Sequence, residues 1–175
     1  MATVSSFTDH NLDEQGFEYL DHEAKVRYAL PLRFTPAVGT LLIVIGSVRR
    51  SPVWLGSAAL IALSGALFPR GMVLDVVYNV GVRHLFRAPP LPPTPRPRRF
   101  SYLLSAGLLT GAAFSHLHRR PVVGFILAGL VVIGATILTT TLWCLGSWIY
   151  RLLLGLFGDR RRVEHRLPVP CGGRG

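Results

Sequence analysis

Four long apolar runs constrain this chain more than any other feature. They cover approximately residues 30–48, 52–69, 100–118 and 121–150. An α-helix rises about 1.5 Å per residue, so about 18 to 20 residues just cross a hydrocarbon core of ~30 Å. Half of the 175 residues are hydrophobic and only 16% are charged, which is more apolar surface than a soluble domain of this size can bury. We therefore expect an all-α membrane protein with four transmembrane helices.

Short basic turns join these runs in pairs. Residues 49–51 and 118–120 are each followed by a proline, and proline is well tolerated at the first position of a helix. We therefore expect two helical hairpins. The last run is too long for one straight crossing, so its helix should tilt or extend into the membrane interface. The chain then divides into an acidic N-terminal tail (1–28), a transmembrane domain (29–157) that contains a long connection (70–99), and a basic C-terminal tail (158–175).

The basic residues are distributed unequally over this arrangement. Of the 19 Lys and Arg residues, 15 lie in or near the two tails and the long connection, and 4 lie in the two short turns. The positive-inside rule therefore predicts a bacterial inner-membrane protein with both termini in the cytoplasm. In a soluble protein a net charge of +10 would indicate nucleic acid, but arginines between apolar runs follow membrane topology, so no nucleic-acid partner is expected. Residues 1–24 hold six acids and no Lys or Arg, and this segment can pack against the arginines or remain unfolded.

The long connection begins with a segment that has a helical pattern. Residues 71–87 place polar side chains four apart on one ridge and valines on another face. This pattern is typical of a helix that lies at the membrane surface. The polar ridge consists of Asp75, Asn79, Arg83 and Arg87.

A proline-rich strap follows this helix. Residues 88–100 contain six prolines, which predicts an extended polyproline II conformation with arginines at the level of the lipid headgroups. We interpret the strap as a stiff spacer, and the alternative is a docking site for a proline-recognising partner or anionic lipid. The arginines expected to bind a partner or lipid are Arg83, Arg87, Arg96, Arg98, Arg99, Arg160, Arg161 and Arg162.

Small residues recur at helical spacing within the runs. In lipid, such residues let helices approach closely and gain dispersion contacts. Packing within one four-helix bundle is the simplest interpretation, and a homo-oligomer or a larger membrane-protein complex is the alternative. The residues expected at these contacts are Gly107, Gly111, Gly124 and Ala128.

The runs carry few groups suited to catalysis or metal binding. Arg33 is the only charged residue within a run, and it lies near the start of the run at 30–48. Ion-coupled transporters usually need a mid-membrane carboxylate or histidine. His116 and His118 point in different directions on a helix and are interpreted as interfacial side chains. We therefore expect no cofactor, no metal site and no catalytic residue, which favours a non-enzymatic protein.

The end of the last run, residues 139–150, combines threonines, a cysteine and aromatic residues. The threonine hydroxyls can bond to carbonyls one turn back, which lowers their cost in lipid. Cys144 and Ser147 are three apart and share a helix face. In apolar surroundings a cysteine acts as a small packing side chain, and the alternative is that Cys144 is a lone reactive thiol.

Several of these segments resemble an uncharacterised family of small bacterial membrane proteins, catalogued as a domain of unknown function with four predicted helices. The resemblance rests on "LFPRG", "LPPTPRPRRF" and "WCLGSWIY" and covers roughly residues 25–155. It implies a proline-rich loop that ends in an Arg-Phe step and a last helix carrying Cys-x-Gly-Cys. Cys144 and Gly146 match that motif, and Ser147 replaces its second cysteine. The family's cysteine pair suggests a redox or metal role, but a serine cannot close a disulfide with Cys144.

These observations favour a structural or accessory subunit of the inner membrane. We expect its arginine-rich cytoplasmic face to bind a membrane-protein partner or anionic lipid. One alternative is a thiol-redox or sulfur-handling component that uses Cys144, and a third is a small-solute channel.

Overall fold

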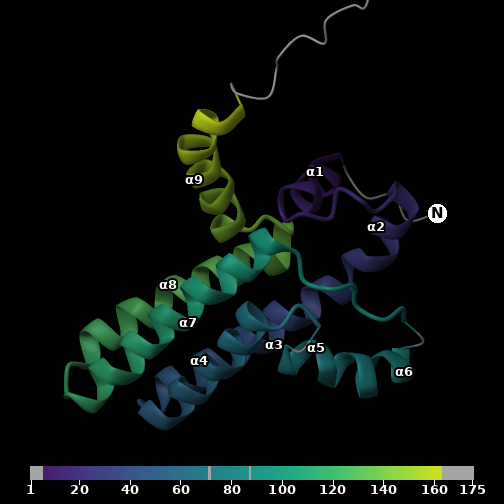
Figure 1. Ribbon diagram of the computed structural model, residues 1–175. Helices are drawn as coiled ribbons and strands as arrows, with labels where there is room; N and C mark the ends of the chain where they lie inside the picture. The colour runs from purple at the N-terminus through teal and green to yellow at the C-terminus, as the bar shows by residue number, and fades with distance from the viewer. Residues whose placement is uncertain (1–5, 71, 87, 163–175) are drawn as a thin grey trace, which may run out of the picture.

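The computed structural model describes residues 6–70, 72–86 and 88–162, and the regular structure in these ranges is helical. Four helices form the body of the molecule, and shorter or flanking helices cover one end of it (Figure 1). The helices are α1 (Ser6–Glu14), α2 (His22–Ala29), α3 (Pro31–Val48), α4 (Pro52–Leu67), α5 (Val73–Val77), a π-helical turn (Tyr78–Val82), α6 (Arg83–Phe86), α7 (Arg96–Leu117), α8 (Pro121–Thr141) and α9 (Leu145–Arg162).

The body is a ring of four helices. α3 packs against α4 and α8, and α7 packs against the same two helices. The shared core is built from small and branched side chains, which permit the close approach of α4 to α7 and of α7 to α8. The buried core residues are Ile43, Leu55, Ala58, Ala59, Leu109, Ala112, Ala128 and Val131.

Three helical stretches are long and apolar enough to cross a membrane. These are His22–Val48, which joins α2 and α3, then Arg96–Leu117 and Pro121–Thr141. Large apolar side chains on the outside of the ring, such as Leu60, Leu103 and Ile133, are exposed, as expected of a surface that faces lipid. The chain therefore has the features of an all-helical membrane protein. α4 is apolar but shorter than these stretches.

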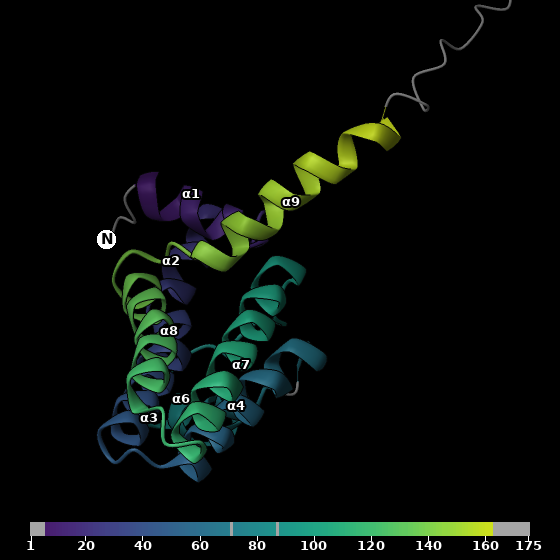
Figure 2. The ribbon, with the colours of Figure 1, turned by 90° about the vertical axis from the view of Figure 1, so that its left-hand side faces the viewer.

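The last apolar run does not form the single helix that we expected over residues 121–150. α8 ends at Thr141, Leu142 adopts a left-handed conformation with φ of 54°, and a new helix begins at Leu145. Figure 2 shows α9 leaving the bundle in a direction different from that of α8. The expected threonine bonds are present, because the hydroxyls of Thr139, Thr140 and Thr141 each donate to a carbonyl four residues back, at 2.7 to 2.9 Å.

Side chains from the N-terminal segment explain where α8 ends. Asn11 Nδ2 donates to the Thr141 carbonyl at 2.9 Å, and Gln15 Nε2 donates to the Leu142 carbonyl at 2.6 Å. The last carbonyls of a helix lack partners within the helix, so these two buried amides satisfy groups that would otherwise stay unpaired. The break in the helix is therefore stabilised from outside the helix.

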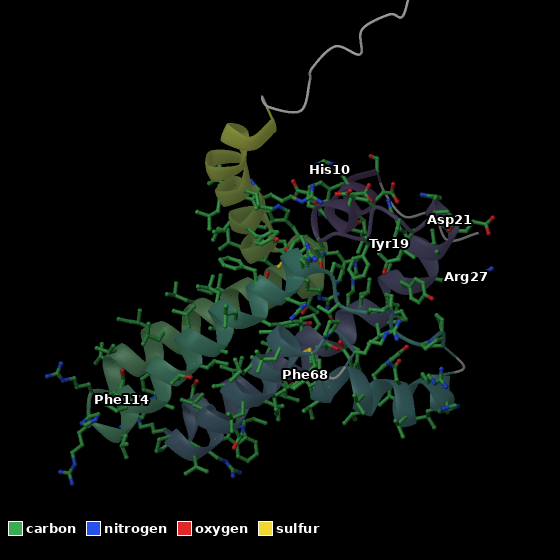
Figure 3. All side chains as sticks on the ribbon, viewed as in Figure 1. His10, Tyr19, Asp21, Arg27, Phe68 and Phe114 are labelled. Carbon is green, nitrogen blue, oxygen red and sulfur yellow. The ribbon has the colours of Figure 1, made fainter. Side chains whose placement is uncertain are left out.

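The acidic N-terminal segment is folded where the structure describes it. α1 and α2 lie at the end of the bundle from which α9 departs (Figures 1 and 2). Lys25 is buried and pairs with Asp13 at 2.6 Å and with Asp9 at 3.4 Å. Figure 3 shows the labelled side chains of α1, α2 and the turn between them at one end of the molecule and Phe114 at the other.

The long connection is a helix followed by a strap that is bonded to it. Asn79 Oδ1 accepts a bond from the Leu91 amide at 2.7 Å, and the Thr94 hydroxyl donates to Asp75 at 3.4 Å. Tyr78 is buried against Phe34, and this burial raises the pKa of its phenol although nearby Arg83 acts in the opposite direction. Asp75 and Asn79 of the polar ridge thus hold the strap against the helix.

Candidate functional site

Three polar side chains meet where α7 begins and α9 begins. Ser101 Oγ of α7 lies 3.0 Å from Cys144 Sγ and 3.5 Å from Ser147 Oγ. Cys144 is 6% exposed and Ser147 is fully buried. The Cys144 carbonyl accepts a bond from the Trp148 amide at 3.0 Å, so Cys144 stands at the first turn of α9.

Gly146 allows this close meeting of helices. A Cβ atom on Gly146 would lie 2.5 Å from Ser101 Oγ and 2.8 Å from Ser101 Cα. Both distances are shorter than any ordinary van der Waals contact, so only glycine fits against Ser101. The Cys-x-Gly-Ser sequence therefore has a structural explanation: its glycine brings the cysteine and the serine onto α7.

Arg98 lies beside this cluster and is buried. Its side chain is 4% exposed, its Nε donates to the Tyr102 hydroxyl at 3.2 Å, and Nη2 donates to the Leu32 carbonyl at 3.3 Å. Its guanidinium also lies 5.9 Å from the ring centroids of Phe17 and Tyr102, within the range of a cation–π interaction. The expectation that Arg98 belongs to an exposed arginine face therefore does not hold, since this arginine points into the protein.

The other arginines of the expected face have different surroundings. Arg99 donates to the carbonyls of Ala66 and Leu67 at 2.8 and 3.0 Å and so caps the end of α4. Arg96 is exposed, and Arg83 is half-buried with its Nε 3.3 Å from His84. Arg87 lies outside the described residues. Arg160, Arg161 and Arg162 form the end of α9, and the structure describes their backbone alone.

A cavity of about 290 Å³ opens beside Cys144 and Arg98 and continues between the helices of the ring. Its polar end is formed by Thr35, Arg98, Ser101, Tyr102 and Cys144. The rest of its wall is mostly apolar and comes mainly from α3, α4, α7 and α8, with Met72 and Leu74 from the connection and Leu145 and Gly146 from α9. The Cys144 thiol is thus almost fully buried and borders this cavity.

The four small residues expected at helix contacts fall into two groups. Gly124 and Ala128 are buried, and a Cβ on Gly124 would lie 2.7 Å from the His116 ring of α7. A Cβ on Gly111 would lie 3.1 Å from Leu127 Cδ1. These three residues therefore lie where α7 meets α8. Gly107 is exposed and a Cβ there would meet nothing within 4 Å, so it takes no part in this contact.

Within the ranges that the structure describes, no group of three His, Cys, Asp or Glu side chains could hold a metal ion. His116 packs edge-on against Phe125, and His118 packs against Phe114. Both histidines thus lie at the end of α7 and contact aromatic rings, His116 a ring of α8 and His118 a ring of α7.

The sequence reasoning missed three polar residues of this region. Thr35 donates its hydroxyl to Asp75, which links α3 to the connection helix, and Asn11 and Gln15 reach the end of α8. Asn11 lies in α1 and Gln15 directly follows its end, and their spacing of four residues places both amides on one side. That spacing is visible in the sequence, but their partners are more than 100 residues away.

Comparison with known proteins identifies a family. The family model described as "Domain of unknown function (DUF4395)" matches residues 30–154. No curated protein and no solved structure matches the chain.

Proposed function

The chain belongs to the DUF4395 family of domains of unknown function, and we propose that it is a bacterial inner-membrane protein with an accessory role. In this proposal α3, α4, α7 and α8 all cross the membrane as two hairpins, and both termini lie in the cytoplasm. The unequal distribution of basic residues supports that orientation, because 15 of the 19 Lys and Arg residues lie in or near the tails and the long connection, which would then face the cytoplasm.

One observation carries the accessory role: α9 leaves the bundle with its apolar side chains uncovered. Leu145, Trp148, Leu152 and Leu154 are each between 43% and 53% exposed. α9 packs against α7 and α1 near its beginning and ends in three consecutive arginines. A helix that combines exposed leucines with a basic end fits a membrane-protein partner or an anionic lipid surface.

Some of the arginines form hydrogen bonds within the protein, so fewer of them can belong to a binding surface. Arg98, Arg99 and Arg151 form bonds within the protein, Arg151 with the Glu14 carbonyl at 2.9 Å. Among the expected arginines whose side chains are described, Arg96 is exposed and Arg83 is half-buried. We assign partner or lipid binding to Arg96 and to the three arginines in sequence at the end of α9. α9 is therefore the main element that would bind a partner or lipid.

Purification in mild detergent, followed by mass spectrometry of co-purifying subunits and lipids, tests this role. We expect a triple variant with Arg160→Gln, Arg161→Gln and Arg162→Gln to lose the co-purifying subunit or anionic lipid. The matched control replaces the three arginines Arg49, Arg119 and Arg120 with glutamine at the opposite end of the bundle and should retain it. A lone monomer without lipid preference, or equal losses in both variants, would refute the role.

The orientation of the protein in the membrane can be tested separately by labelling native Cys171. An impermeant maleimide added to intact cells should leave Cys171 unlabelled and should label an Arg119→Cys variant. The reverse pattern would overturn the orientation.

A thiol function of Cys144 is the second candidate. The observation that favours it is that the thiol borders the cavity beside Ser101 and Arg98. Its 6% exposure excludes direct exchange with a protein partner in this conformation, so any reactant would have to be a small molecule that enters the cavity. The channel alternative has less support, because the cavity wall away from the polar end is mostly apolar.

A further inference from the structure

The cavity between the helices combines a buried cation with a long apolar wall. At its polar end, Arg98 forms no ion pair with any carboxylate of the described ranges. Asp75 interacts with Arg98 electrostatically without contacting it, and the Asp75 oxygens accept bonds from Thr35 and Thr94 instead. A buried guanidinium without a contacting anion is costly, and an ionisable side chain inside a membrane protein often marks a binding site.

The polar end of the cavity is rich in hydrogen-bond donors. Arg98, Ser101 and Tyr102 are related by spacings of three and four residues, which place them on the same side of α7, and all three can donate to a ligand. A guanidinium binds a carboxylate or a phosphate through charge-assisted bonds, which are stronger in low-dielectric surroundings. This end therefore suits an anionic headgroup.

The apolar part has the shape needed for one hydrocarbon chain. Along α7 the lining extends from Arg98 to Leu109, which corresponds to about 16 Å of helix. The volume of about 290 Å³ lies close to the lower end of the range for small-molecule sites, which suits one hydrocarbon chain inside the cavity. A Cβ on Gly134, which lines the cavity, would meet no atom within 4 Å.

We propose that this cavity binds a single-chain amphiphile whose anionic headgroup, a carboxylate or a phosphate, lies against Arg98. The hydrocarbon chain lies between α3, α4, α7 and α8. Because lipid tails are as apolar as the cavity wall, the chain gains little by leaving the bilayer. Selectivity therefore comes from the headgroup, and this role is independent of what α9 binds.

Binding can be measured with the full-length protein in nanodiscs of zwitterionic phosphatidylcholine, with empty nanodiscs as background. Radiolabelled dodecanoate should bind saturably. Dodecanol has the same chain and no charge, and it should compete at least tenfold more weakly than dodecanoate or dodecyl phosphate. The stronger of the two anionic competitors identifies the headgroup. Equal competition by dodecanol, or no saturable binding of either anion, would overturn the proposal.

A pair of glycine variants in α8 links binding to the cavity without altering Arg98. Gly134→Leu should fill the cavity and weaken dodecanoate binding at least tenfold. Gly129→Leu is the matched control, because its Cβ also meets nothing within 4 Å but the residue does not line the cavity. Its binding should equal that of the unmodified protein. Unchanged binding in Gly134→Leu, or an equal loss in both variants, would place the ligand elsewhere and overturn the proposal. Arg98→Gln should abolish the preference for an anion over dodecanol.

Discussion

The contact between Gly146 and Ser101 leads to a prediction whose magnitude can be worked from the structure. In a Gly146→Ala variant the new Cβ would lie 2.5 Å from Ser101 Oγ, 2.8 Å from its Cβ and 2.8 Å from its Cα. A change of the serine rotamer can move Oγ, but it cannot move Cα. Relief of the clash therefore requires α9 to move away from α7.

The expected cost combines two opposing effects. Overpacking of this kind usually destabilises a protein by about 1–3 kcal/mol. Replacement of glycine by alanine inside a helix stabilises it by roughly 0.5–1 kcal/mol. Gly155→Ala is the matched control, because Gly155 lies in the same helix and its Cβ would meet nothing within 4 Å. Since the helix-propensity gain is common to both variants, Gly146→Ala should be less stable than Gly155→Ala by about 1–3 kcal/mol.

Equilibrium unfolding in detergent, followed by tryptophan fluorescence, measures this difference. Trp143 and Trp148 flank the Cys-x-Gly-Ser segment and report directly on it. If Gly146→Ala is as stable as Gly155→Ala or more stable, the close approach of α9 to α7 is wrong, and the explanation of the glycine fails with it.

Two further predictions concern the same end of the molecule. Gln15→Ala removes the buried donor to the Leu142 carbonyl, so the free energy of unfolding should fall by about 1–3 kcal/mol. The control His10→Ala, on the exposed face of α1, should change it by less than about 0.5 kcal/mol. Equal effects of the two substitutions would show that the bond from Gln15 does not stabilise the end of α8. In a Cys171→Ser background, N-ethylmaleimide should label Cys144 at least tenfold more slowly than a cysteine introduced as Leu145→Cys, because the two positions are 6% and 44% exposed. Equal labelling rates would show that the Cys144 thiol is accessible.

The apolar helices could be predicted from the sequence because their signals are local. The runs at 30–48 and 52–69 correspond to α3 and α4, which end at Val48 and Leu67. Prolines at the first positions of α3, α4 and α8 mark their starts correctly, since a missing amide hydrogen costs nothing there. Polarity and spacing in a single segment contain enough information for these features.

The break after α8 could not be predicted from its own segment. No glycine or proline stands at Leu142 or Trp143, and the apolar run continues without interruption. The stabilising bond to the Leu142 carbonyl comes from Gln15, which is 127 residues away in the sequence. A non-local partner of this kind leaves no trace in local hydropathy, so the expected single helix was wrong.

The arginines in the last part of the predicted strap show a third situation, in which the charges were recognised but were assigned to an extended segment instead of a helix. If α7 is taken to begin near Phe100, Arg96, Arg98 and Arg99 are simply charges on an extended segment. The structure starts α7 at Arg96, so successive side chains rotate by about 100° around the helix. Arg98 then falls in phase with Tyr102 and with the buried positions Ala106, Leu109 and Ala112. Arg96 and Arg99 fall on other faces, one exposed and one directed at the end of α4. A cation that shares the buried stripe of a helix is not available to a surface partner, and this is why the cavity, rather than the surface, is where Arg98 can bind a ligand.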